Sequence, residues 1–178
     1  RAETCTSHFN VIARDGTHVA VTQTLLSVFG SRMMLPSSGI LMNNGIMWFD
    51  PEPGKPNSLG PAKRCLTNMS PTMLERSDGA RYALGASGGR KILPATVQIS
   101  SYLLDYGMDL DSAFHHPRID TSLAGTAIVD PTLPPEVGAE LKGDGLEVHF
   151  APRTMYPYHF ACPSAVGWEG GKQVGATE

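Results

Sequence analysis

The chain has 178 residues, of which 41% are hydrophobic and 17% are charged, and its formal net charge is -3. A chain of this length and composition forms a globular domain with a sizeable core, which excludes intrinsic disorder. No basic patch accompanies the negative charge, so we expect no nucleic-acid partner. No apolar run approaches the roughly 18 residues of a membrane-spanning helix, so we also expect no membrane contact.

Cysteine usage argues against a disulfide framework and against a zinc site. Cys5, Cys65 and Cys162 are odd in number, and no two of them have Cys-x-x-Cys spacing. We therefore predict reduced, mostly buried thiols and no metal or other cofactor. The sequence begins at Arg1 without a methionine, so a lost leader stays open, and a cytoplasmic and an exported location are both compatible with it.

The first predicted element is a β-hairpin near the start of the chain. Residues 8–13 and 18–26 alternate like strands, and the Asp15-Gly16 pair between them tolerates the positive φ angles of a tight turn. The small nucleophilic cluster Thr4-Cys5-Thr6-Ser7 leads directly into the first strand. One interpretation of this cluster is no more than a polar start to an edge strand.

The later elements are predicted from periodicity and turn residues. Residues 29–44 predict a loop with a short strand at 40–42, and the Pro- and Gly-rich segment 50–61 predicts an irregular surface segment. A second hairpin is predicted from residues 69–75 and 81–86. Beyond it we predict helices at 92–106, 109–115 and 134–142, and strands at 146–150, 164–168 and 172–176.

Together these elements predict a single α+β domain over residues 1–178, in which antiparallel sheet packs against helices. The first helix is expected to present one face to the core. The members of that face are Ile92, Val97, Ser100, Leu103 and Leu104.

Two segments are candidates for nucleophilic catalysis. Thr6 becomes a candidate nucleophile if the peptide bond between Cys5 and Thr6 is cut, because the new α-amino group, with a pKa of about 8, can take the hydroxyl proton. The amides of Gly88-Gly89, just before a helix, are candidates for binding an oxyanion. A tight turn or a phosphate-binding loop are the alternatives for the glycine pair, although the Lys-Ser/Thr pattern of a P-loop is missing.

Two further clusters have simpler explanations. Adjacent histidines such as His115-His116 point in different directions on a helix, and no carboxylate–histidine spacing supports a zinc site. A surface or partly buried pair is the expected reading, with a metal-dependent hydrolase as a distant alternative. The second cluster consists of aromatic and methionine residues, which could line an apolar pocket or simply pack in a core. Its members are Trp48, Phe49, Met33, Met34, Met42 and Met47.

Ten short segments follow one another along nearly the entire chain. Each is common in proteins, but their order together is specific to one protein family. The segments are Thr6-Ser7-His8-Phe9, Asp15-Gly16, Thr22-Gln23-Thr24, Phe29-Gly30, Ser38-Gly39-Ile40-Leu41-Met42-Asn43-Asn44, Pro53-Gly54-Lys55-Pro56-Asn57, Gly60-Pro61-Ala62-Lys63-Arg64, Met69-Ser70-Pro71-Thr72, Gly85-Ala86-Ser87-Gly88-Gly89 and Asp105-Tyr106-Gly107-Met108. In this order they resemble the small, C-terminal subunit of the γ-glutamyltranspeptidase family of N-terminal-nucleophile hydrolases.

The resemblance implies a four-layer αββα sandwich, completed by a large N-terminal subunit after autocleavage between Cys5 and Thr6. Thr6 then matches the catalytic threonine, and Thr24 matches the threonine that supports it. Gly88 and Gly89 match the pair that forms the oxyanion hole. The implied reaction is acyl transfer from a small-molecule amide through an acyl-enzyme, in a heterodimer that allows a further dimer of heterodimers.

The positions that would bind the substrate depart from the family pattern. Leu26 stands where γ-glutamyl enzymes have an asparagine, Gly45 and Trp48 stand where they have a glutamine and an aspartate, and Thr67-Asn68 replaces a serine pair. We therefore expect an amidohydrolase or acyltransferase whose substrate is not a typical γ-glutamyl compound. The alternatives are a genuine γ-glutamyltranspeptidase (glutathione hydrolase) and an uncleaved, catalytically silent relative with a binding role.

Overall fold

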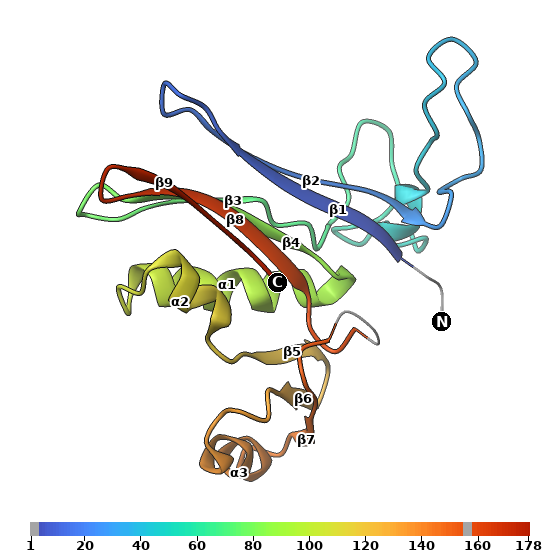
Figure 1. Ribbon diagram of the computed structural model, residues 1–178. Helices are drawn as coiled ribbons and strands as arrows, with labels where there is room; N and C mark the ends of the chain where they lie inside the picture. The colour runs from blue at the N-terminus through green and yellow to red at the C-terminus, as the bar shows by residue number, and fades with distance from the viewer. Residues whose placement is uncertain (1–3, 155–157) are drawn as a thin grey trace. The chain divides into compact units, whose positions relative to one another are not determined.

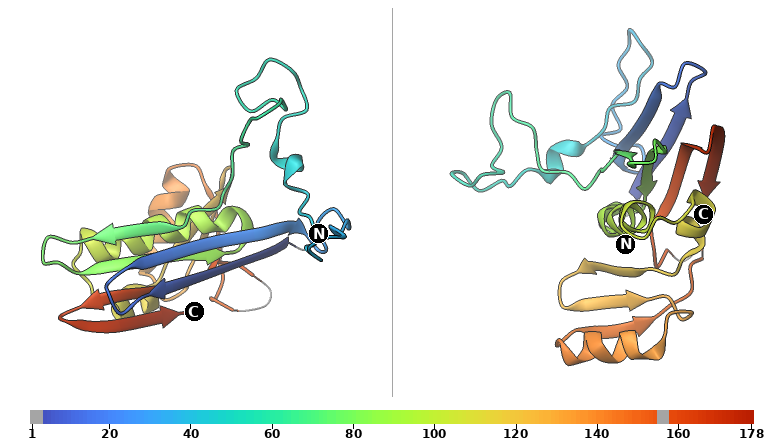
Figure 2. Two further views of the ribbon diagram at one scale, coloured as in Figure 1. Left: turned by 90° about the horizontal axis from the view of Figure 1, so that it is seen from above. Right: turned by 90° about the vertical axis from the view of Figure 1, so that its left-hand side faces the viewer.

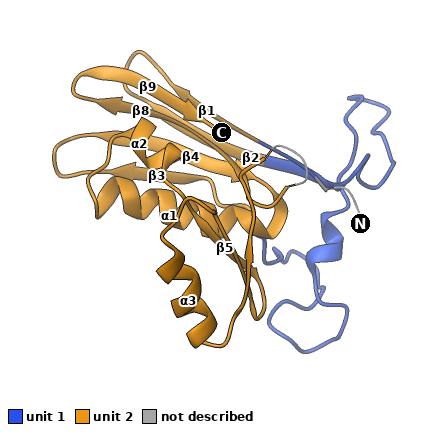
Figure 3. Cartoon of the chain, turned by 60° about the horizontal axis from the view of Figure 1, so that its bottom comes forward, with its two compact units in different colours: residues 1–7, 23–68 blue, residues 8–22, 69–178 orange. Residues whose placement is uncertain are grey.

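A computed structural model of the protein describes residues 4–154 and 158–178. Within it the chain divides into two compact units (Figure 3). The first unit consists of Arg1–Ser7 and Gln23–Asn68, and the second consists of His8–Thr22 and Met69–Glu178. The expectation of a single domain over the whole chain stays a prediction.

The predicted first hairpin is confirmed and is longer than expected. It consists of β1 (Thr4–Ile12) and β2 (His18–Ser27), which pair in a two-stranded sheet. In the turn, the Thr17 amide donates to Asp15 Oδ1 at 3.0 Å, and Gly16 has a φ of +85°. The local turn chemistry thus closes this hairpin as the sequence predicts.

The second unit is built on a four-stranded antiparallel sheet with the order β3-β4-β8-β9 (Figure 1). Its strands are β3 (Thr72–Glu75), β4 (Arg81–Ser87), β8 (Cys162–Glu169) and β9 (Lys172–Thr177). The predicted hairpin of β3 and β4 is confirmed, and so are the two strands predicted at 164–168 and 172–176. β4 and β8 pair in the middle of the sheet, which places β4 among its most buried parts.

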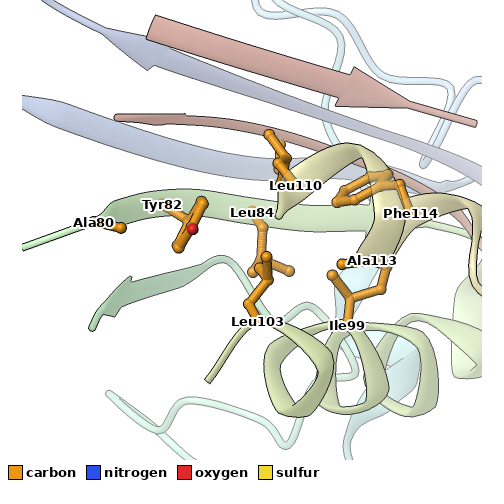
Figure 4. Close-up of a cluster of buried hydrophobic side chains, with 9 residues drawn as sticks. Ala80, Tyr82, Leu84, Ile99, Leu103, Leu110, Ala113 and Phe114 are labelled. Carbon is orange, nitrogen blue, oxygen red and sulfur yellow. The ribbon is translucent and has the colours of Figure 1, made fainter. Parts of the chain in front are cut away.

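Two helices cover one face of this sheet: α1 (Ile92–Leu104), which follows the short 3-10 helix η2 (Gly89–Lys91), and α2 (Leu110–His115). Side chains from β4 and from both helices meet in the core (Figure 4). The buried members of this core are Ala80, Tyr82, Leu84, Ile99, Leu103, Leu110, Ala113, Phe114 and Ala165. Residues 8–22 of the hairpin lie along the opposite face of the sheet (Figures 1 and 2).

The predicted helices are confirmed, but the predicted core face of α1 is partly wrong. Val97 and Leu104 are 58% and 42% exposed, whereas Thr96 is only 2% exposed. Thr96 tolerates burial because its hydroxyl donates to the Ile92 carbonyl oxygen at 2.8 Å. Asp109 caps α2 by accepting a hydrogen bond from the Ser112 amide at 2.7 Å.

A smaller three-stranded sheet, β5-β6-β7, completes the second unit. Its elements are β5 (Ile119–Leu123), β6 (Thr126–Val129), α3 (Pro135–Gly143) and β7 (Glu147–Phe150). α3 and β7 match the prediction, but β5 and β6 were not predicted. β6 and β7 run parallel, with α3 as the connection between them.

The first unit is mostly irregular outside the hairpin and contains the short 3-10 helix η1 (Gly45–Trp48). The strand predicted at 40–42 is wrong, because only an isolated bridge between Met34 and Leu41 forms there. Met33, Met34 and Met47 are exposed, so they do not form a buried core.

Two general features complete the description of the fold. Cys5, Cys65 and Cys162 are free and half-buried, so the prediction of mostly buried thiols is only partly met. In the described part of the chain, no helix has both the length and the apolar character needed to cross a bilayer.

Candidate functional site

The hydroxyl groups of Thr6 and Thr24 form the centre of the candidate site. Thr6 on β1 lies opposite Thr24 on β2, and the Thr6 hydroxyl donates to Thr24 Oγ1 at 3.2 Å. The Thr24 hydroxyl in turn donates to the carbonyl oxygen of Cys5. The Leu26 amide also donates to Thr24 Oγ1 at 2.9 Å. Thr24 is therefore held from two sides while it bonds the carbonyl group of the Cys5–Thr6 peptide bond.

The backbone near the end of β2 is strained at Leu26, two residues after Thr24. Leu26 has a φ of +73°, a left-handed conformation that costs a non-glycine residue about 1–3 kcal/mol. Asn44 holds the following residue: its Oδ1 accepts from the Ser27 amide at 3.1 Å, and its Nδ2 donates to the Ser27 hydroxyl at 2.8 Å. The residue in this left-handed conformation is therefore the one whose amide donates to Thr24.

The other residues expected to bind substrate lie in the same first unit. Gly45 is buried, and a β-carbon added there would lie 3.2 Å from the Trp48 ring, so the two positions are in contact. Trp48 is fixed through its carbonyl oxygen, which accepts from Asn57 Nδ2 at 2.7 Å. Thr67 is exposed and Asn68 is half-buried, both in an irregular segment.

Gly88 and Gly89 belong to the second unit, at the junction between β4 and η2. Both have positive φ angles, +136° and +63°. A β-carbon at Gly88 would lie 2.8 Å from the Ala161 Cα atom, so the turn packs directly against that backbone. Amides at the start of a helix have no acceptor inside it, which leaves this pair suited to bind an anionic oxygen.

A set of polar side chains on the inward face of the hairpin was not predicted from the sequence. His8 Nε2 lies 2.8 Å from Asn10 Oδ1, and His8 Nδ1 lies 2.7 Å from the Thr22 hydroxyl. Asn10 Nδ2 donates to the Ser164 carbonyl oxygen at 3.0 Å. We call His8, Asn10, Thr22 and Ser164 the polar ladder. Its signal was available, because Thr6, His8 and Asn10 are spaced by two residues and so share one face of β1.

The polar ladder defines the protonation of His8. The Ser164 carbonyl oxygen can only accept, so it fixes the Asn10 amide with Oδ1 toward His8. His8 Nε2 therefore carries the proton and donates, and Nδ1 accepts from the Thr22 hydroxyl. Burial lowers the pKa of His8 below its ordinary value, and the hydrogen bond with Asn10 opposes that shift.

Close packing of Gly85 against the His8 ring gives a prediction about stability. A β-carbon at Gly85 would lie 2.3 Å from His8 Cε1, so Gly85→Ala should displace the ring and lower the free energy of unfolding by about 1–3 kcal/mol. Urea denaturation of the full-length protein measures this change. Gly175→Ala is the control, because its nearest neighbour would be 3.8 Å away. Equal losses in the two variants would show that contact with His8 is unimportant.

Each ring of the histidine pair has its own neighbour. His115 Nδ1 donates to the Asp111 carbonyl oxygen at 2.9 Å, and the His116 ring stacks edge-on against Tyr102 with centroids 4.6 Å apart. Among the residues that the structure describes, no group of at least three His, Cys, Asp or Glu side chains could hold a metal ion.

Comparison with known proteins gives consistent matches. The family profile described as Gamma-glutamyltranspeptidase matches residues 1–178. The glutathione hydrolase proenzyme of Bacillus subtilis (strain 168) is 35% identical over 145 residues, which are 82% of this chain and 25% of that protein. The acylase ACY 1 proenzyme of Pseudomonas sp. (strain SE83) is 34% identical over 148 residues, which are 83% of this chain and 26% of that protein.

A solved structure agrees with these matches. A highly active mutant of the γ-glutamyltranspeptidase from Pseudomonas nitroreducens aligns with a TM-score of 0.73 at 26% identity, over 96% of this chain and 93% of that chain. The chain spans about a quarter of the length of the two curated relatives. Since the family profile matches the chain from its first residue to its last, the chain belongs to the γ-glutamyltranspeptidase family.

Proposed function

We propose that this chain carries the catalytic threonine of an amidohydrolase or acyltransferase that activates itself by cutting the Cys5–Thr6 bond. The arrangement around that bond is the observation that carries the proposal. The Thr6 hydroxyl donates to Thr24, and the Thr24 hydroxyl donates to the carbonyl oxygen of Cys5. The nucleophile, its supporting hydroxyl and the bond to be cut thus share one chain of hydrogen bonds.

The cleavage step follows from this geometry. Thr6 Oγ1 attacks the carbonyl carbon of Cys5, and Thr24 stabilises the negative charge that develops on the carbonyl oxygen. The C–N bond breaks, the Thr6 nitrogen takes the proton, and an ester links Cys5 to Thr6 Oγ1. Water then hydrolyses the ester, which leaves a carboxylate on Cys5 and a free α-amino group on Thr6. That amine serves as the base for later turnovers.

In the mature enzyme, Thr6 would attack a small-molecule amide, and the acyl-enzyme would pass its acyl group to water or to an amine. The amides of Gly88 and Gly89 would stabilise the tetrahedral oxyanion. The partner is a large N-terminal subunit from the same precursor, which is supported by the quarter-length match to proenzymes. In the second unit, helices, sheet and hairpin already stack as three successive layers, which supports the four-layer αββα sandwich (Figure 2).

The substrate is proposed to be more apolar than a γ-glutamyl compound. Leu26, Gly45 and Trp48 have no charged or amide side chain to bind the polar groups of a γ-glutamyl donor, and only Thr67 and Asn68 stay polar among these positions. Each buried polar group left without a partner costs about 1–3 kcal/mol. The names of the relatives include both a glutathione hydrolase and an acylase, and the apolar character of Leu26 and Trp48 supports the acylase class.

A substrate panel tests this assignment on the full-length, self-processed protein. We expect kcat/KM for p-nitroanilides of apolar acyl groups to exceed that for γ-glutamyl-p-nitroanilide by about tenfold or more, since a loss of 1.4 kcal/mol equals tenfold. Trp48→Asp should raise γ-glutamyl turnover by a similar factor because a carboxylate would pair with the substrate amine.

Trp48→Phe is the matched control for that substitution, because it keeps an apolar ring and should leave the preference unchanged. Fast γ-glutamyl turnover by the wild type would favour a genuine γ-glutamyltranspeptidase instead. A protein that neither cuts itself nor hydrolyses any member of the panel would favour the catalytically silent alternative.

A further inference from the structure

A nearly buried ion pair lies just beyond the glycine turn. Lys91, the last residue of η2, bonds Asp120 of β5 with 2.8 Å between Nζ and Oδ2, and their side chains are 17% and 3% exposed. Asp120 Oδ2 also accepts from the Ser122 hydroxyl at 2.9 Å. Burying two charges gives little net stability, because desolvation offsets their attraction. A role in fixing geometry explains the pair better than a role in stability.

The rest of the junction already holds α1 to β5. Gln98 of α1 donates to the Ile119 carbonyl oxygen at 2.6 Å and accepts from the Ile119 amide at 2.9 Å. These two bonds fix the helix itself without help from Lys91. The Lys91–Asp120 pair acts earlier in the chain, at the turn that leads into the helix.

That turn needs an anchor because it contains two consecutive glycines with positive φ angles, Gly88 and Gly89. Glycine has the greatest backbone freedom of any residue. On one side, contact of Gly88 with Ala161 limits the movement of the turn. On the other side, the Lys91 amide donates to the Gly88 carbonyl oxygen at 3.3 Å, so a fixed Lys91 also fixes the orientation of the Gly88 peptide.

We infer that Lys91 is a positioning residue for the Gly88–Gly89 turn and that Asp120 is its anchor. The inference rests on the proposed function, in which the two glycine amides face the oxyanion. Hydrogen-bond donors to a transition state must be held within about 0.5 Å of the productive geometry. A lysine fixed at both its side chain and its amide gives the turn that rigidity.

The test uses the full-length precursor with Asp120→Asn, Lys91→Met and Lys91→Arg. Asp120→Asn and Lys91→Met should lower kcat about tenfold while KM changes less than twofold, because only the transition state needs the aligned amides. Lys91→Arg should recover most of the lost rate, since it keeps a cation opposite Asp120. Asp130→Asn is the matched control: it breaks the buried Arg153–Asp130 pair, 2.8 Å long, in the same unit.

A second readout does not depend on turnover. The amides of Lys91 and Ile92 donate to the carbonyl oxygens of Gly88 and Gly89, so their hydrogen exchange reports the order of the turn. Asp120→Asn should speed this exchange about tenfold, and Asp130→Asn should leave it unchanged. Equal effects of Asp120→Asn and Asp130→Asn on exchange would overturn the inference. An inactive wild type that shows the exchange difference would contradict the proposed function and leave the positioning role intact.

Discussion

Thr6→Ala is expected to leave the full-length precursor uncut and to lower its amide turnover by about 10⁴-fold or more. Removing the nucleophile of a hydrolase has effects of this size. Alanine also removes the hydroxyl that donates to Thr24, so neither self-cleavage nor acyl transfer can begin. Mass spectrometry of the purified protein measures the first effect, since the wild type should yield a fragment that starts at Thr6.

Ser7→Ala is the control for this variant. Ser7 is the next residue along β1, has its own hydroxyl, and lies on the exposed face of the strand. The Ser7→Ala precursor should cut itself and should turn over substrate like the wild type. A wild-type enzyme that is active with its Cys5–Thr6 bond intact would contradict the proposed role of Thr6.

Gly88→Ala is expected to lower kcat by about 10²–10³-fold, the range measured when one oxyanion-hole donor is lost. The added methyl group would lie 2.8 Å from the Ala161 Cα atom, and the φ of +136° is unsuited to alanine. The turn must therefore shift, and its amides shift with it. We also expect the free energy of unfolding to fall by about 1–3 kcal/mol.

Gly107→Ala separates backbone strain from the effect on catalysis. Gly107 also has a positive φ, +66°, but a β-carbon there would meet nothing within 4 Å. It should lower stability by about 1 kcal/mol and leave kcat unchanged. Steady-state kinetics and urea denaturation measure both quantities. An equal loss of kcat in the two glycine variants would contradict the proposal that the Gly88 amide stabilises the oxyanion.

The elements that the sequence predicts well are those with a local cause. The Asp15-Gly16 turn and the Asp109 cap of α2 act within a few residues, and the turn forms as expected. β5 and β6 were missed although a tight turn at Ala124-Gly125 joins them, because both strands are short and β6 also pairs with the distant strand β7. Val97 was predicted to be buried but is exposed, because tertiary packing and not helical spacing determines which face of α1 is buried.

The candidate site was predictable to the extent that it lies on one hairpin. Once the two strands are paired, Thr6 and Thr24 must lie opposite each other, as the structure places them. The Lys91–Asp120 pair could not be predicted, because it joins η2 to a strand that the sequence does not reveal. The left-handed conformation of Leu26 was equally hidden, since leucine rarely adopts it.

The polar ladder has a consequence for a newly formed chain end. Terminal residues usually fray, and ordering one residue costs about 1–2 kcal/mol in backbone entropy. If the Cys5–Thr6 bond is cut as proposed, Thr6 becomes such an end only two residues before His8. His8 and Asn10 tie the following part of β1 to Thr22 and Ser164. The new amine would then start its first turnover already ordered, with the entropy of a free terminus removed before the cut is made.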